Sequence, residues 1–322
     1  MGLSVFASPL LKVFMGNKKK NLAFRSEGRF GLTVALIPLI GYLMFQLVPL
    51  CVAISTMFVD MKGYQLDTMK WNNFATFKEV LTDEKFWISL TRTLGLLMTQ
   101  FVGLFIALVT STLLAQKYRG TKVYTALFFV PYICSSVAIT IMWMTMFNND
   151  YGVINEIIEN FFGESSRINW YTKPGPFFAM MFIITVWQAP GYGIVMYNAA
   201  FTQVPKSLYE AASIDGAGKF RQFWNITMPS IRPTTFFLIM AGIINGLQTF
   251  AIPMLLSSTL GNAWTGAAGP DDAGLVTMLY VYNTGITFNE IPKAAVMSFV
   301  LFIIIMTLTI INFRIERSKD ND

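Results

Sequence analysis

Six apolar stretches, each long enough to cross a lipid bilayer as a helix, constrain the fold of this chain. A hydrocarbon core about 30 Å thick needs roughly 20 apolar residues in an α-helix, and none of the six stretches contains Asp or Glu. With 54% hydrophobic residues, 13% charged residues and a mean hydropathy of +0.52, the chain is too apolar for a soluble domain of 322 residues. The sequence predicts an all-α membrane protein with six transmembrane helices, at residues 31–58, 86–116, 123–147, 177–203, 234–257 and 294–313.

Positive charge in the connecting segments predicts how these helices are oriented. Lys and Arg are retained on the cytoplasmic side of membrane proteins. Two thirds of the 24 basic residues lie in the N-terminal tail, the 117–122 turn, the 204–233 loop and the C-terminal tail. We therefore expect a cytoplasmic tail with an amphipathic segment at 1–30, a transmembrane domain at 31–313 whose 204–233 loop is cytoplasmic, and a cytoplasmic tail at 314–322.

The residues that the chain lacks exclude several kinds of chemistry. Histidine is absent, so imidazole metal sites and histidine-based catalysis are excluded. The Gly216–Lys219 segment resembles the end of a phosphate-binding loop, but Ser213 replaces the first Gly and Phe220 stands where Ser or Thr is needed. The net charge is +6, but the basic residues are not gathered on one helix, which argues against nucleic-acid binding. We expect no catalytic residue, no metal site and no cofactor on this chain.

The 204–233 loop is longer than a connection between two membrane helices requires, since such loops usually run roughly 2 to 8 residues. Pro205 suits the first turn of a helix, and Ser207 with Glu210 has the spacing of a capping box. A short helix is therefore predicted to start near residue 205. Gly216 supplies the left-handed residue that ends it.

A second short helix is expected to follow Gly216. Phe220, Phe223 and Trp224 recur at helical spacing, and Pro229 with Pro233 is expected to break the helix. The loop thus predicts two helices and a hinge at the cytoplasmic surface.

Seven residues in this loop have a spacing that is characteristic of one protein family. The loop resembles the EAA loop of ATP-binding-cassette importer permeases, and its longer form, EAA-x-x-DGA, is similar to the carbohydrate branch typified by the maltose and glycerol-phosphate systems. The resemblance implies a type I importer permease fold with a cytoplasmic EAA coupling loop, whose first helix seats in a groove on an ATPase subunit. The resemblance assigns the coupling between the permease and the ATPase to Glu210, Ala211, Ala212, Asp215, Gly216, Ile226 and Pro229. Capping by Glu210 is compatible with docking, because a rigid helix transmits force better.

The resemblance extends over most of the chain. Residues 29–58 are similar to the first span of the larger-type subunit of this branch, and Thr93-Leu94 to the NTL sequence at the second. A W-x-x-x-F-N…G-x-x-N signature follows the third span, at Trp143, Phe147, Asn148, Gly152 and Asn155. The chain departs from the family at 261–274, where a T-x-GGP element is common, so the resemblance does not imply the shape of that loop.

Polar, uncharged side chains in the fourth and fifth spans are the candidates for a substrate path. Amides and hydroxyls suit the hydroxyl groups of a solute, and an aromatic ring can stack on a sugar face. The candidates are Gln188, Tyr192, Asn245, Gln248 and Thr249. By resemblance, Gln188 and Tyr192, and also Gln248 and Thr249, fall near positions that line the sugar path. The alternative that these side chains only bond neighbouring helices stays open.

Charge is almost absent from the spans, and this argues against a self-sufficient secondary transporter. Proton- or sodium-driven carriers place acids or broken-helix ion sites at mid-membrane. The one intramembrane charge, Arg92, lies near the outer end of the second span. We expect Arg92 to reach the membrane surface, with contact to an anionic substrate as the alternative. Gly242 and Gly246 form a GxxxG pair, which predicts a helix-packing notch.

We therefore expect a permease subunit, not an enzyme, of an ATP-driven, binding-protein-dependent importer of a sugar, in particular an oligosaccharide. By resemblance its partners are two ATPase subunits that hold ATP and Mg²⁺, a second permease subunit that is a different chain, and an extracellular solute-binding protein. It would lie in the bacterial cytoplasmic membrane with both termini inside. Two alternatives stay open: an importer of the same class for a polyol, glycerol phosphodiester or peptide, and a membrane scaffold that binds a soluble partner without transport.

Overall fold

The computed structural model divides the chain into two compact units, Met1–Phe58 and Val59–Asp322. The residues that it describes are 33–61, 63, 65–115, 120–258 and 268–320. The predicted tail at 1–30 lies outside these residues, and so do the basic residues Lys117 and Arg119 of the predicted cytoplasmic turn.

The described part of the first unit is one apolar helix, Thr33–Thr56, which corresponds to the first predicted span. It contains a π turn, η1 (Leu43–Leu47), followed by α2 (Val48–Thr56) with Pro49 in its first turn. Proline has no N–H for the carbonyl four residues earlier and clashes with it. A π turn just before the proline widens the helix at this point, so the helix continues through Pro49.

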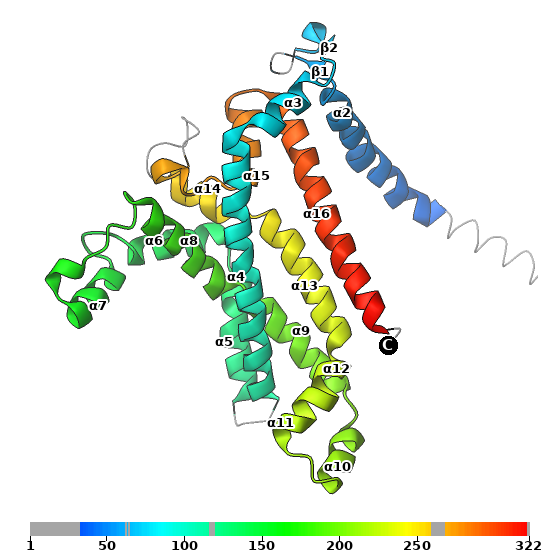
Figure 1. The fold of residues 1–322 in the computed structure, drawn as a ribbon, viewed down its shortest axis with the longest axis vertical. Helices are drawn as coiled ribbons and strands as arrows, with labels where there is room; N and C mark the ends of the chain where they lie inside the picture. The colour runs from blue at the N-terminus through cyan, green and yellow to red at the C-terminus, as the bar shows by residue number, and fades with distance from the viewer. Residues whose placement is uncertain (1–32, 62, 64, 116–119, 259–267, 321–322) are drawn as a thin grey trace, which may run out of the picture. The chain divides into compact units, whose positions relative to one another are not determined.

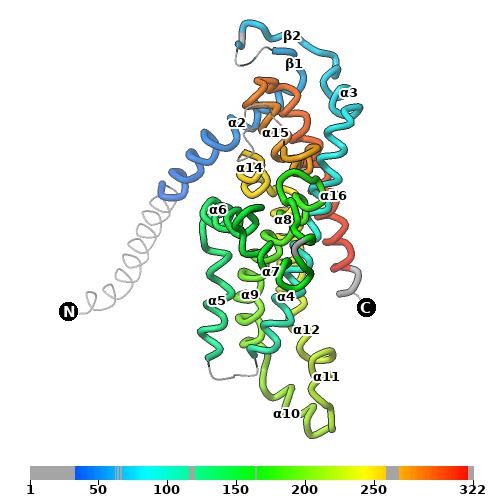
Figure 2. The backbone as a smooth tube through the Cα atoms, turned by 90° about the vertical axis from the view of Figure 1, so that its left-hand side faces the viewer, coloured from blue at the N-terminus to red at the C-terminus, as the bar shows by residue number. Residues whose placement is uncertain are grey.

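The second unit is a helical bundle with a small antiparallel ribbon, in which β1 (Val59–Asp60) pairs with β2 (Lys70–Trp71). Its α-helices are α3 (Ala75–Thr82), α4 (Glu84–Leu114), α5 (Thr121–Ile133), α6 (Ser136–Met146), α7 (Val153–Phe162), α8 (Pro174–Gln188), α9 (Pro190–Gln203), α10 (Lys206–Ile214), α11 (Lys219–Gln222), α12 (Met228–Ser230), α13 (Arg232–Leu247), α14 (Ala251–Ser257), α15 (Thr277–Tyr282) and α16 (Ile291–Asp320). Figures 1 and 2 place α10 and α11 at one end of this unit, the loop end, and the β-ribbon with α3 at the opposite end, the ribbon end.

Five of the six predicted spans are helical segments without a sharp bend. They are Thr33–Thr56, Glu84–Leu114, Pro174–Gln203, Arg232–Ser257 and Ile291–Arg317. The fourth predicted span is formed by α8 and α9 together, and the fifth by α13 and α14. These helices satisfy their backbone polar groups internally, as a segment surrounded by lipid must.

The third predicted span, 123–147, is not a single helix, and this corrects the sequence expectation. Its two halves, α5 and α6, are bent by 97° relative to each other. Cys134 and Ser135 have extended backbone conformations at the break. Pro131 lies in the last turn of α5 and removes a hydrogen-bond donor there. The helix α5 ends at Ile133, two residues after this proline.

The helix α4 is the centre of the bundle, and it packs against α8, α9 and α13. Small residues allow these close approaches. A Cβ added at Gly193 of α9 would lie 2.8 Å from the Cβ of Ala107, and one added at Gly246 of α13 would lie 2.6 Å from Cδ1 of Leu97. The predicted packing notch at Gly242 and Gly246 is therefore confirmed, with α4 as its partner.

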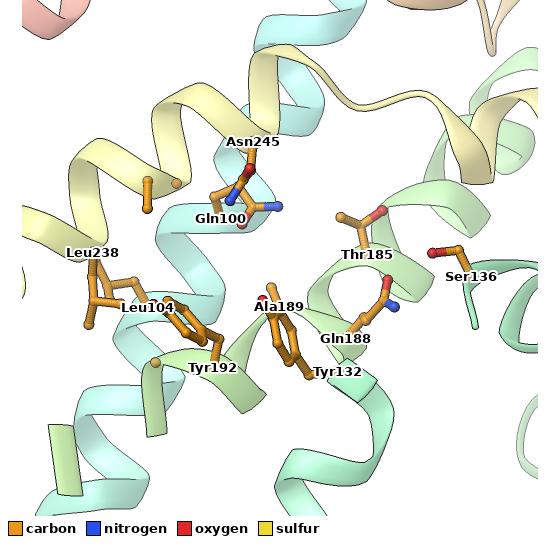
Figure 3. A pocket seen from close by; sticks show the side chains of 13 residues that line it. Gln100, Leu104, Tyr132, Ser136, Thr185, Gln188, Ala189, Tyr192, Leu238 and Asn245 are labelled. Atoms are coloured by element: carbon orange, nitrogen blue, oxygen red, sulfur yellow. The ribbon is translucent and has the colours of Figure 1, made fainter. Parts of the chain in front are cut away.

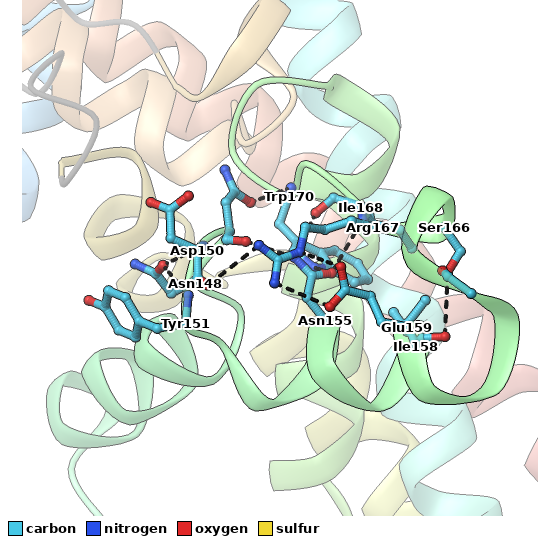
Figure 4. Close-up of polar contacts among 12 residues, drawn as sticks. Asn148, Asp150, Tyr151, Asn155, Ile158, Glu159, Ser166, Arg167, Ile168 and Trp170 are labelled. Carbon is cyan, nitrogen blue, oxygen red and sulfur yellow. Dashed lines mark hydrogen bonds and ion pairs between the residues drawn. The ribbon is translucent and has the colours of Figure 1, made fainter.

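The W-x-x-x-F-N…G-x-x-N signature organises the segment around α7 (Figure 4). Asn155 is fully buried, and its Oδ1 accepts hydrogen bonds from the Ile168 N–H at 3.2 Å and from Trp170 Nε1 at 3.1 Å. The ring of Phe147 is buried against Trp170, with ring centroids 4.7 Å apart. A Cβ at Gly152 would overlap the backbone of Asn148. The signature is thus structural: it ties the α6–α7 connection to the residues before α8.

The connection before α15 forms a tight turn that reaches Arg92. Gly269 has a φ of +80°, and a Cβ there would lie 2.6 Å from the ring of Phe177, so glycine is required. Nη2 of Arg92 donates to the carbonyl of Asp271 at 3.1 Å. Arg92 therefore fastens α4 to this turn, a role that the sequence did not suggest.

Four charged and polar side chains form a network of hydrogen bonds and ion pairs at the ribbon end. Asp83 caps α4 by accepting from the N–H of Lys85 at 3.0 Å. Its Oδ2 accepts from the Tyr280 hydroxyl at 2.7 Å and lies 3.3 Å from Lys293 Nζ, which is also 2.9 Å from Glu79. Burial alone would raise the pKa of the Asp83 carboxyl, but the Tyr280 hydroxyl and the Lys293 ammonium outweigh burial and lower this pKa below its ordinary value of 3.8.

We predict that Tyr280→Phe lowers the stability of the assembled protein at pH 7 by about 1 kcal/mol, because the ionised Asp83 loses a donor. A lowered pKa contributes stability above pH 3.8 that is lost as the pH falls through the folded-state pKa. The deficit of the variant should therefore shrink below about pH 4. Thermal unfolding of the purified protein at pH 7 and at a pH below about 4 tests this prediction. Tyr282→Phe, on the same helix, is the control. An equal loss of stability in both variants would show that the hydrogen bond from Tyr280 to Asp83 does not account for it.

Candidate translocation cavity and coupling loop

A cavity of about 440 Å³ lies among α4, α8, α9 and α13, beside the break between α5 and α6 (Figure 3). Its polar and aromatic lining residues are Gln100, Tyr132, Ser136, Thr185, Gln188, Tyr192 and Asn245, and the others are Leu104, Ala189, Gly193, Leu238, Ala241 and Gly242. None of these thirteen residues is charged. The cavity therefore offers amides, hydroxyls and aromatic rings, but no counter-ion.

Three of the five predicted path residues line this cavity. Gln188 and Tyr192 come from the junction of α8 with α9, and Asn245 comes from the last turns of α13. Gln248 and Thr249 are not among the lining residues. They lie in the connection between α13 and α14, because α13 ends at Leu247.

Two of these lining residues, Gln188 and Tyr192, also contact a neighbouring helix. The alternative role, in which these side chains bond neighbouring helices, is therefore present in part. Nε2 of Gln188 donates to the carbonyl of Pro131 at 3.4 Å. The ring of Tyr192 stacks on Tyr132, with centroids 5.4 Å apart and planes 25° apart. A Cβ at Gly191 would lie only 2.7 Å from the Cβ of Tyr132, so this glycine lets α9 approach α5 and brings the two rings together.

Four polar or aromatic lining residues were missed by the sequence reasoning: Gln100, Tyr132, Ser136 and Thr185. Gln100 was detectable as an uncharged polar residue within the second predicted span, one helical turn from Leu104. Tyr132 and Ser136 flank the break between α5 and α6, and they reach the cavity because the third span is bent there. A reading of that span as one straight helix gave no reason to single them out.

The candidate coupling loop, residues 204–233, includes α10, whose start differs from the expectation. The helix begins at Lys206 with Pro205 as its N-cap, and the N-cap makes no side-chain hydrogen bond. Ser207 is therefore the second helical residue, and the predicted capping box between Ser207 and Glu210 does not form. A capping box requires its Ser at the N-cap position itself.

The predicted end of this helix at Gly216 is confirmed. Gly216 has a φ of +74°. Its N–H donates to the carbonyl of Ser213 at 3.1 Å, and the N–H of Ala217 donates to the carbonyl of Ala212 at 2.8 Å. These two bonds form a Schellman motif, which satisfies carbonyls at the end of α10.

The second helix of the loop does not end at Pro229, which corrects the prediction. It runs from α11 through a π turn, η4 (Phe223–Thr227), into α12, and it ends at Ile231. As at Pro49, a π turn directly precedes the proline and allows the helix to continue. Pro233 does not end a helix either, because it lies in the first turn of α13.

Side-chain hydrogen bonds fasten α10 to this second helix. The hydroxyl oxygens of Tyr209 and Thr227 lie 2.8 Å apart. Nε2 of Gln222 donates to Oγ of Ser213 at 2.9 Å and to the carbonyl of Ala217 at 3.0 Å. The two helices of the loop are therefore joined at the middle and at the carboxyl end of α10.

The outward surface of the loop is exposed. No residue of α10 is buried, and Glu210, Ala211 and Asp215 are all exposed. Ile214 is 87% exposed and Phe220 is 78% exposed. Exposed large apolar side chains that lie close together are typical of a surface that contacts another protein or a membrane.

Comparison with known proteins agrees with this geometry. Residues 101–320 match the family described as the binding-protein-dependent transport system inner membrane component. The chain is 32% identical to the probable ABC transporter permease protein YesP of Bacillus subtilis (strain 168), over 92% of this chain and 93% of that protein. It is 28% identical to the sn-glycerol-3-phosphate transport system permease protein UgpA of Shigella flexneri, over 81% of this chain and 84% of that protein.

Two solved structures share the fold. A bacterial ABC transporter involved in the import of the acidic polysaccharide alginate superposes with a TM-score of 0.76 at 20% identity, over 92% of this chain and 99% of that chain. The bacterial alginate ABC transporter in complex with an alginate pentasaccharide-bound periplasmic protein also gives a TM-score of 0.76, at 18% identity. The chain belongs to the binding-protein-dependent transport system inner membrane component family and is a permease subunit of the ABC sugar importer type, not an enzyme.

Proposed function

We propose that this permease subunit forms half of the translocation path for a neutral saccharide and that the cavity between α4, α8, α9 and α13 is part of that path. The observation that carries the proposal is the lining: amides, hydroxyls and two stacked tyrosines, with no charge among the thirteen residues. Amide and hydroxyl groups match the donors and acceptors of sugar hydroxyls. Aromatic faces match the apolar faces of sugar rings.

The absence of charge from the lining distinguishes between cargo classes. Relatives and neighbours include proteins named for sn-glycerol-3-phosphate and for the acidic polysaccharide alginate. Burying an anion in a cavity without a counter-charge costs several kcal/mol, so this half of the path favours a neutral cargo. A polyol has the same chemistry and is the second candidate, whereas glycerol phosphodiesters and charged peptides fit less well.

The partners of the proposed importer follow from the two ends of the bundle. The exposed residues of α10 and the exposed Phe220 support our proposal that an ATPase subunit docks at the loop end and that this end faces the cytoplasm. We also propose that both termini are cytoplasmic. One of the alginate transporter structures is a complex with an alginate pentasaccharide-bound periplasmic protein, and we propose that the ribbon end receives an extracellular solute-binding protein here. A second permease subunit would close the cavity. A scaffold without transport would have no use for a polar cavity inside the bundle.

The cavity proposal predicts lower uptake when its lining loses a stacking or hydrogen-bonding group. Tyr192→Leu and Gln188→Ala should each reduce the rate of saccharide uptake by about three- to tenfold, as expected for the loss of roughly 1 kcal/mol. Uptake of labelled sugars by proteoliposomes with the complete transporter is the measurement. Gln203→Ala removes an exposed amide at the far end of α9 and serves as control. Normal uptake by both cavity variants would remove these residues from the path.

The coupling proposal predicts that the loop is needed for communication and not for insertion. Glu210→Lys, which reverses an exposed charge on α10, and Gly216→Pro, which cannot adopt the φ of +74°, should abolish substrate-stimulated ATPase activity of the complete transporter. Both should insert normally. Gly216→Asn is the matched control, since Asn tolerates this backbone conformation and a Cβ here meets no atom within 4 Å. Wild-type stimulation in Glu210→Lys would count heavily against coupling through α10.

A further inference from the structure

A second hollow lies on the other side of α13, away from the cavity. It is a groove of about 590 Å³ between the start of α13 and the carboxyl end of α16, and its lining includes Pro229, Arg232, Phe236, Phe313, Glu316 and Arg317. Phe236 and Phe313 form its apolar part, with ring centroids 5.9 Å apart. None of these residues has a role in the proposed transport of sugar except Pro229.

The groove is lined by two basic side chains and one acidic side chain among the described residues. Nε of Arg232 lies 2.6 Å from Oε1 of Glu316, and its Nη2 donates to the Glu316 carbonyl at 3.0 Å. Glu316, the one acid among the described lining residues, is therefore already paired. Arg317 is exposed and makes no ion pair with any residue in the described part of the chain. One positive charge is thus left for an anion that would enter the groove.

An apolar track on α16 leads into this groove. Exposed side chains recur at i, i+3, i+7 and i+10, and Arg317 continues the same face one turn further on. The track consists of Ile303, Met306, Ile310 and Phe313, which are 38%, 40%, 45% and 57% exposed. At 1.5 Å per residue, the rise from Ile303 to Phe313 is about 15 Å. This is half of the hydrocarbon thickness, which is the depth of one leaflet.

We propose that the groove binds one anionic phospholipid, with its phosphate at Arg317 and an acyl chain along the track on α16. An apolar track one leaflet long that ends in an unpaired Arg matches the charge and the length of such a lipid. A protein helix in the same place would cover the track but would need an acid opposite Arg317. The site rests only on α16 crossing the membrane. It does not depend on which end of the bundle faces the cytoplasm, nor on the cargo.

The test is photolabelling of the complete transporter in nanodiscs of zwitterionic phosphatidylcholine. A trace of phosphatidylglycerol with a diazirine in its acyl chain is added, and labelled peptides are mapped by mass spectrometry. Label is expected on the 303–313 segment of α16, and unlabelled phosphatidylglycerol should displace it while extra phosphatidylcholine should not. Arg317→Gln should raise the displacing concentration about fivefold, as expected for one basic residue at a membrane surface.

Arg314→Gln is the matched control, because it removes the same charge one turn earlier on α16 from a side chain that does not line the groove. It should leave the displacing concentration nearly unchanged, and Arg317→Lys should restore it. An equal loss in both Gln variants would show diffuse attraction and overturn the proposal. So would displacement by inorganic phosphate, or absence of label from this segment. The wild-type comparison of the two lipids decides the question even if Arg317→Gln fails to assemble.

Discussion

The lipid interior offers no hydrogen bonds to the backbone, and the rest of the structure depends on this constraint. Helices meet it along their length, so a break inside a span is tolerated only where protein or a water-filled cavity surrounds it. Three of the spans are interrupted: α5 and α6 at Cys134–Ser135, α8 and α9 at Pro190, and α13 and α14 after Leu247. Tyr132 and Ser136, Gln188 and Tyr192, and Asn245 lie within a few residues of these points and all line one cavity. The cavity is therefore located where the helices are interrupted.

The apolar runs and the spacing of the loop residues were sufficient to predict the spans, the family and the end of α10 at Gly216. They were not sufficient to separate prolines that bend a helix from prolines that do not. Pro49 and Pro229 each follow a π turn and the helix continues, whereas Pro131 precedes a 97° bend. The difference lies in whether the chain can widen by one residue before the proline, and this depends on packing. Gln100 was missed for a related reason: its place in the cavity depends on which face of α4 meets α13.

The loop and the cavity are connected by continuous structure. α10 is held to the second helix by Tyr209 and Gln222, and that helix leads through α12 into α13 with one turn at Ile231. α13 carries Asn245 into the cavity and packs on α4 through Gly246. A displacement of α10 would therefore reach the cavity through rigid, packed elements, which is the physical requirement for coupling between distant sites.

The two sides of α13 explain how the proposed path for a neutral cargo and the proposed anion site can coexist in one small bundle. Leu238, Ala241, Gly242 and Asn245 follow the i, i+3, i+4, i+7 pattern and face the cavity, whereas Arg232 and Phe236 line the groove with α16. Arg232 is neutralised by Glu316 at 2.6 Å, so its charge is held at the end of the helix, away from the cavity. An arginine on the opposite face would give the path a fixed charge and select anions. The helix α13 therefore places Arg232 and Phe236 on the groove side, and Ala241, Gly242 and Asn245 on the cavity side.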